Sequence, residues 1–398
     1  MSASRKIGLI LEPLDVLFFR DGRPFGASTR AGGAQPLPQT LAGALRTALL
    51  QHYGCDFDKL AASTREAGTG HRMNAGTLGE LIERSGSPRW IAELEVRGPW
   101  LGRVACHHPK SAAVSGKCAC EVLVPVPASL HMPKKSREGP LQSLRPLVSR
   151  AVPGWSETPQ GRAGLRPLWS CDRTPGEPAS GYLSPQGLRA FLRSADVPPG
   201  ERFKGTDLMD TDHRTGIAIE PDRLTAAESL IYGASFLSLK RNVALGTQET
   251  KYDIVFYAEV AVTPAAGESP FAGIKTFAWG GEGRRVAIRA TVPFPWHESE
   301  SNGGKPLLVL TTPGLFADPS RPAILNGHIV SAAVPSSVPV SGWDLARGGP
   351  RPNRFATAAG SVFFLDQLPQ NLPSSLSDDD FDAQQGWGCY VKGTWTDE

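Results

Sequence analysis

The sequence predicts an α+β protein with mostly antiparallel sheets. Apolar segments that alternate as strands recur along the 398 residues, and one segment has a clear helical period. No strand–helix pair repeats in the way that a parallel sheet requires. The 43 glycines and 35 prolines place many turns between short elements, and the length allows two or three domains.

The N-terminal half is expected to hold a strand, a helix and two further strands, at residues 7–17, 37–54, 92–98 and 121–127. In the helix, Leu41, Leu45 and Leu49 share one face, which indicates packing on a sheet. Gly54 then stands where a helix would stop.

The C-terminal half is expected to form a second sheet, with strands in 214–220, 252–263, 277–290, 305–314, 340–366 and 385–395. In the second of these strands one face carries Ile254, Phe256, Ala258, Val260 and Val262. We therefore expect one domain at residues 1–205 and another at residues 206–398.

The stretch 131–205 is expected to protrude from the first domain as a basic insertion. It is rich in proline, glycine and arginine and has no sustained period. From His131 to Arg193 it carries ten lysines and arginines against four acids, whereas residues 371–398 carry six acids and one lysine. Because the whole chain has a net charge of only +3, a nucleic-acid surface would have to be a local patch.

The segment FFRDGRPFG, residues 18–26, carries more charge and aromatic surface than a turn requires. Arg20 and Arg23 are candidate contacts to RNA phosphates, and Phe25 could pack on a base. The alternative is that Arg20 pairs with Asp15 or Asp21 and that Phe25 belongs to the core.

A glycine-rich loop at residues 279–285, in WGGEGRR, is a second candidate RNA site. Its glycines let a phosphate backbone approach the backbone amides, and two arginines follow the glycines. The candidate residues are Gly280, Gly281, Gly283, Arg284 and Arg285. The spacing fits neither a dinucleotide-binding loop nor a P-loop. The alternative is a tight turn whose arginine pair lies in water.

One face of the predicted helix, with Gln39, Gly43 and Arg46, could also accept an RNA backbone. Alternatively, Gly43 only permits close packing on the sheet and Arg46 is solvated.

A cysteine- and histidine-rich segment offers zinc-ligand residue types at Cys106, His107, Cys118 and Cys120. The spacing differs from the paired arrangement of zinc fingers, so free thiols are the alternative. No other cofactor is expected.

Asp210, Asp212 and His213 resemble part of a nuclease site, but no second acidic or histidine cluster supports them. An Asp-rich turn leading into a strand is the alternative, and we expect no enzymatic activity.

Taken in order, the motifs resemble the third RAMP subunit of the Cmr-type (type III-B) CRISPR effector complex. They are EPLDVLFFRDGRPF, LPQTLAGALRTALL, LEVRGPWL, VLVPVPASL, RTGIAIE, LIYGASFLSL, WGGEGRR, SGWDL and AAGSVFFL. They span residues 12 to about 395, with little of the pattern in 54–90 and 131–205. Type III-A and type III-D complexes contain related subunits.

The resemblance implies two ferredoxin-like, RRM-type domains and a non-catalytic subunit at the foot of the complex. Such a subunit holds the repeat-derived 5′ tag of the guide RNA. Its neighbours are the polymerase-type large subunit and the first copy of the repeated backbone RAMP subunit, and its contact with target RNA is indirect. The resemblance also implies a hairpin thumb, which we expect within 131–205, where Lys134 and Lys135 are candidate RNA contacts.

Two rival functions belong to other classes. An endoribonuclease of the same superfamily, processing precursor guide RNA, would need a histidine base such as His52 or His213. A pure assembly subunit would leave the arginines solvated. Because Glu12, Pro13 and Asp15 interrupt the N-terminal apolar run, we expect no signal peptide or membrane span and a cytoplasmic protein.

Overall fold

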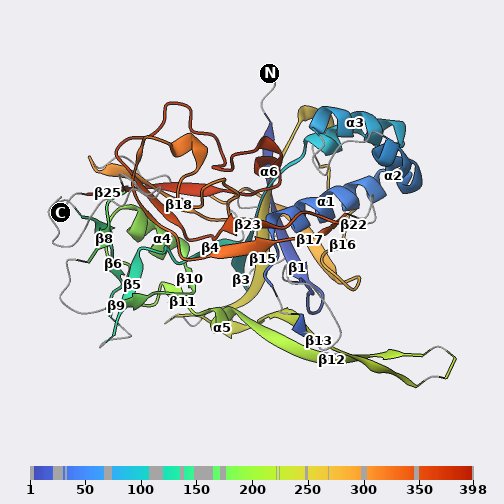
Figure 1. Cartoon of the computed structure of the whole chain (residues 1–398), viewed down its shortest axis with the longest axis horizontal. Helices are drawn as coiled ribbons and strands as arrows, with labels where there is room; N and C mark the ends of the chain where they lie inside the picture. Colours follow the sequence, from blue (N-terminus) through green and yellow to red (C-terminus); the bar gives the residue numbers. More distant parts are fainter. Residues whose placement is uncertain are drawn as a thin grey trace.

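The computed structural model is an α+β fold with mostly antiparallel sheets, as the sequence predicts (Figure 1). It describes residues 4–20, 30–31, 34–66, 74–106, 120–134, 139–147, 165–170, 176–220, 222–223, 225–246, 250–267, 269–296, 303–344 and 349–396. Five candidate site residues lie outside these ranges, namely Arg23, Phe25, His107, Cys118 and Lys135. No helix in the described ranges is long and apolar enough to span a membrane.

A nine-stranded antiparallel sheet forms the centre of the molecule. Its order is β11-β10-β4-β3-β15-β1-β17-β16, and β14 also pairs with β15. The strands are β1 (Arg5–Pro13), β3 (Glu95–Ala105), β4 (Glu121–Pro125), β10 (Tyr182–Leu183), β11 (Arg202–Phe203), β14 (Val243–Ala244), β15 (Lys251–Val262), β16 (Thr276–Ala278) and β17 (Arg285–Thr291). Since β15 lies between β1 and β3, one sheet joins strands from both sides of residue 205. The division into domains at that residue, and the ferredoxin-like arrangement, stay predictions.

β15 shows why this sheet is central. Ile254, Phe256 and Ala258 belong to one core cluster, and the intervening Val255 and Tyr257 belong to another. The shared face predicted for this strand is confirmed, and the residues between are buried as well. Because both faces are covered, the strand has the nearly continuous apolar sequence of a strand with no solvent side.

A four-stranded sheet of order β19-β24-β18-β25 supplies much of the second cluster. Its strands are β18 (Lys305–Leu310), β19 (Ile329–Ala333), β24 (Val362–Leu365) and β25 (Tyr390–Trp395). Shorter strands flank the two sheets: β5 (Leu130–Pro133), β6 (Gln142–Ser143), β7 (Arg145–Pro146), β8 (Leu168–Trp169), β9 (Gly176–Pro178), β20 (Ser337–Val340), β21 (Trp343–Asp344), β22 (Gly349–Pro350) and β23 (Arg354–Thr357).

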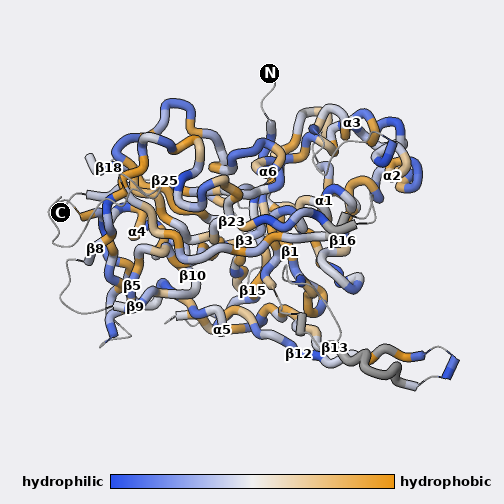
Figure 2. The backbone as a smooth tube through the Cα atoms, in the orientation of Figure 1, coloured by the Kyte–Doolittle hydropathy of each residue, from blue (hydrophilic) through white to orange (hydrophobic). Residues whose placement is uncertain are grey.

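The helix predicted at residues 37–54 is confirmed as α1 (Pro38–His52), whose Leu41, Leu45 and Leu49 are fully buried. The chain leaves it through Gly54 at φ +75°, a left-handed conformation that favours glycine. The other helices are α2 (Phe57–Glu66), α3 (Ala75–Arg84), α4 (Pro185–Leu192), α5 (Gly205–Leu208) and α6 (Asp380–Gln384). The sequence did not predict α2, which buries no residue and is largely hydrophilic in Figure 2; its Leu60 is only partly buried against the first core cluster.

The first strand is shorter than predicted. β1 ends at Pro13, whose nitrogen has no hydrogen to continue a ladder, and Leu17 then forms an isolated bridge with Leu237.

The part of the chain that protrudes is a long hairpin of β12 (Met209–Ile219) and β13 (Ala226–Leu239), which extends away from the body in Figure 1. β2 (Arg30–Ala31) pairs with β13 in parallel near the base of the hairpin. The expectation of an insertion protruding throughout 131–205 is wrong for its C-terminal part. Leu188, Phe191 and Leu192 of α4 are buried in the second core cluster, because this short helix packs on β4 and β25.

Candidate nucleic-acid interface

The two motifs richest in arginine and glycine meet in space. The glycine-rich loop joins β16 to β17, and its Gly281 N–H donates to the Phe18 carbonyl oxygen at 2.8 Å. Gly280 has φ +89°, and a Cβ atom there would lie 2.5 Å from the same oxygen. Glycine is therefore required at this position both by conformation and by space. The contact places Phe18, the first residue of the FFR segment (Phe18, Phe19 and Arg20), against the loop.

Arg20 and Arg285 are exposed at this junction. The Arg285 guanidinium donates to the Thr276 hydroxyl at 2.7 and 3.1 Å and to the Thr276 carbonyl at 3.1 Å. These bonds hold the side chain along β16 while leaving it open to solvent. Arg20 lines a cleft of about 580 Å³, whose wall also includes Gln35, Trp100 and Tyr182. A cleft of this size suits a small ligand or a nucleotide.

Arg284 differs from its neighbour. Its Nη1 lies 3.1 Å from Asp15 Oδ2, and its Nη2 lies 3.6 Å from Glu282 Oε2. The guanidinium carbon is also 4.9 Å from the centre of the Phe236 ring on β13. Arg284 is thus engaged by carboxylates and by the hairpin.

The other predicted RNA contacts are separate from this junction. Gln39 donates to the Ser341 carbonyl at 3.0 Å, and Lys134 pairs with Glu177 at 3.7 Å on the surface. Arg46 donates to the Leu94 carbonyl at 2.7 Å, and burial lowers its pKa to about 10. The proposal that Gly43 permits close packing is not supported, because nothing lies within 4 Å of a Cβ atom built there.

The acidic and histidine residues of β12 are each engaged. Asp210 pairs with Lys240 at 3.4 Å, and Asp212 pairs with Arg214 at 2.7 Å. His213 Nδ1 lies 2.9 Å from the Ser235 hydroxyl on the facing strand. They lie within the antiparallel strand β12 and not in a turn that precedes it, so the predicted Asp-rich turn is wrong.

The sequence did not predict that β12 and β13 form a projecting hairpin. Ile217 and Ile219 of β12 are 51% and 58% exposed, although both are large and apolar. The sequence pattern that could have predicted the hairpin is a pair of strand-like segments, RTGIAIE and LIYGASFLSL, separated by a short stretch that contains a proline.

The candidate zinc ligands are only partly described. Cys106 follows β3, and its Sγ lies 3.6 Å from Asp253 Oδ1; burial and the Asp253 carboxylate raise the pKa of the thiol. Cys120 is buried. Within the ranges that the structure describes, no group of three or more His, Cys, Asp or Glu side chains could hold a metal ion. The zinc site stays a prediction.

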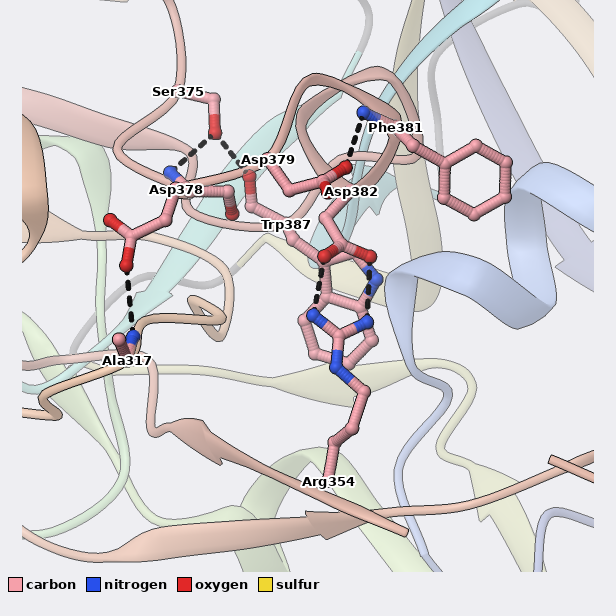
Figure 3. Close-up of polar contacts among 9 residues, drawn as sticks. Ala317, Arg354, Ser375, Asp378, Asp379, Phe381, Asp382 and Trp387 are labelled. Atoms are coloured by element: carbon pink, nitrogen blue, oxygen red, sulfur yellow. Dashed lines mark hydrogen bonds and ion pairs between the residues drawn. The ribbon is translucent and has the colours of Figure 1, made fainter. Parts of the chain in front are cut away.

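The acidic C-terminal segment is a structural element (Figure 3). Asp382 is buried and accepts two hydrogen bonds from the Arg354 guanidinium. Asp378 accepts from the backbone amides of Ala317 and Ala323 at 2.8 and 2.9 Å. These carboxylates therefore connect the C-terminal segment by hydrogen bonds to Ala317, Ala323 and Arg354, which lie earlier in the chain.

A family model described as CRISPR-associated protein (Cas_Cmr3) matches residues 9–395. The chain belongs to this family. The match confirms the resemblance to the third RAMP subunit of the Cmr-type complex. No curated protein matches.

Two solved structures are similar to this Cmr3-family chain. The type III-B Cmr-beta complex bound to cognate target RNA contains a chain with 16% identity and a TM-score of 0.48, covering 90% of this chain and 86% of that one. The same complex bound to cognate target RNA and AMPPnP, state 1, gives 15% identity, a TM-score of 0.48 and the same coverage.

Proposed function

We propose that this chain is a non-catalytic, RNA-binding subunit of a cytoplasmic type III-B CRISPR effector complex, where it holds the repeat-derived 5′ tag of the guide RNA. The observation that carries the proposal is the contact between the glycine-rich loop and the FFR segment in a chain that matches the Cas_Cmr3 family almost throughout. Its proposed protein neighbours are the polymerase-type large subunit and the first backbone RAMP subunit.

The chemistry of the junction supports this role. Single-stranded RNA is held by cations that contact phosphates and by apolar or aromatic surfaces that receive splayed bases. Arg20 and Arg285 supply exposed cations, and the cleft beside Arg20 supplies an apolar wall. The exposed backbone of the glycine-rich loop adds room for a phosphate to approach.

We assign the thumb to the β12–β13 hairpin in place of the stretch 131–205. The hairpin is the element that extends from the body in Figure 1, and Ile217 and Ile219 are exposed on it. Exposed apolar side chains on a projecting arm can separate stacked bases, as apolar wedges do in other nucleic-acid complexes. Through this arm the subunit would meet the guide–target duplex.

The salt dependence of tag-RNA binding tests the phosphate contacts. Arg20→Ala and Arg285→Ala should each weaken binding to all sequences and lower the slope of log affinity against log salt by about 0.7. Arg65→Ala on the exposed face of α2 removes the same charge and serves as the control, with no change in slope. Unchanged slopes for both Arg20→Ala and Arg285→Ala would contradict the interface.

Incubation with labelled repeat RNA separates the three functional classes. Retention without cleavage supports the proposal. Cleavage that is lost in His213→Ala would support the processing endonuclease, and neither retention nor cleavage would support an assembly subunit.

A further inference from the structure

Phe236 lies at the base of the hairpin, and two guanidinium groups lie close to its ring. The guanidinium carbons of Arg214 and Arg284 are 4.7 and 4.9 Å from the centre of its ring. The ring of Phe18 is 5.0 Å away, centre to centre, and Phe236 is only 3% exposed. Arginine above an aromatic ring is a favourable cation–π arrangement. Three segments distant in sequence therefore meet at one side chain.

The charges around this ring do not favour a phosphate. Arg284 pairs with Asp15 and Glu282, and Arg214 pairs with Asp212. The hydrogen bond to Asp212, with further contributions from Asp15 and Glu282, raises the pKa of Arg214. Two positive charges thus stand beside three negative ones, a formal net charge of −1. An RNA phosphate would be repelled by this cluster unless a carboxylate moved away.

The cluster lies where the hairpin leaves the body. The backbones of Leu17 and Leu237 exchange two hydrogen bonds of 2.8 Å, and β2 pairs with Gly233 and Ala234. From Tyr232 toward the tip, the strand pairings in the described part of the chain join β12 only to β13. The contacts at the base therefore set the direction of the whole arm.

We propose that Arg284 is a positioning residue, which joins the glycine-rich loop to Phe236 and so fixes the angle at which the β12–β13 hairpin projects. Asp15 and Glu282 hold the guanidinium over the ring, and Arg214 holds the ring from the hairpin itself. The glycine-rich loop then has two separate roles: Arg285 faces RNA, and Arg284 faces the hairpin. Only the role of Arg285 and the contact of the β12–β13 hairpin with RNA rest on the proposed function.

Hydrogen exchange of the full-length chain tests the inference. Arg284→Met keeps a flexible, unbranched apolar side chain but removes the guanidinium group and its charge, and Arg285→Met makes the same change one residue away. Arg284→Met should raise exchange about tenfold in peptides covering Ser235 to Leu239, with β15 unchanged, because the loss is local to the hairpin base. Arg285→Met should leave both regions unchanged.

Two exchange results would overturn the proposal. One is unchanged exchange at the hairpin base in Arg284→Met, and the other is an equal rise in β15, which would show a general loss of stability.

Tag-RNA binding supplies a second measurement. The salt slope of Arg284→Met should equal that of the unmodified chain, whereas a fall of about 0.7 would make Arg284 a phosphate contact and reject the positioning role. If the chain bound no tag RNA at all, the proposed function would fail while the exchange result would still decide the inference.

Discussion

Replacing Gly280 by alanine should destabilise the junction between the glycine-rich loop and the FFR segment. At φ +89° any residue with a Cβ atom is strained, at a cost of about 1–2 kcal/mol. The added methyl group would also lie 2.5 Å from the Phe18 carbonyl oxygen and 3.0 Å from the Phe19 ring. Relieving such an overlap typically costs about 1–3 kcal/mol.

Gly283 in the same loop is the matched control. It has φ +63°, but nothing lies within 4 Å of a Cβ atom built there. Gly283→Ala should therefore cost about 1 kcal/mol, since alanine also lowers the entropy of the unfolded chain. Gly280→Ala should lower the free energy of unfolding by about 3 kcal/mol. The difference between the two variants measures the cost of the steric overlap with Phe18.

The free energies of unfolding can be compared by urea titration with tryptophan fluorescence, because Trp279, the first residue of the loop, is buried. Gly280→Ala should also weaken tag-RNA binding more than Gly283→Ala, since it moves the segment that carries Arg20. Equal destabilisation by the two variants would show that steric overlap with Phe18 does not contribute to the effect of Gly280→Ala.

Three further outcomes are expected. Gly43→Ala should raise the free energy of unfolding by about 1 kcal/mol, because alanine is the better helix former at this open position of α1; lower stability in urea would contradict this. Arg354→Met should lower it by about 3–5 kcal/mol, since the buried Asp382 carboxylate would lose its partner; a loss below about 1 kcal/mol in the same titration would show that water replaces the arginine. If Cys106 belongs to a closed structural zinc site, elemental analysis of protein purified without chelator should find about one zinc per chain, and less than a tenth of that rejects the site.

Local residue patterns were enough to locate the elements whose burial follows a regular period. Leu41, Leu45 and Leu49 recur at helical spacing, and Ile254, Phe256 and Ala258 recur at strand spacing, so α1 and β15 could be located from local pattern. The α+β class followed from the same periods, and the family resemblance followed from the order of the motifs. These properties depend on residues that are close neighbours in the chain.

Which candidate side chains lie together became visible only from the packing of the folded chain. Arg284 follows three glycines and resembles Arg285 in sequence, yet its carboxylate partner Asp15 is 269 residues away and its aromatic partner Phe236 lies on another sheet. The projecting arm was likewise hidden, because strand periodicity reports a buried face but not whether a hairpin leaves the body. Partners that are distant in the chain and brought together only by packing leave no periodic trace, so their roles become visible only when the strands have been placed in their sheets.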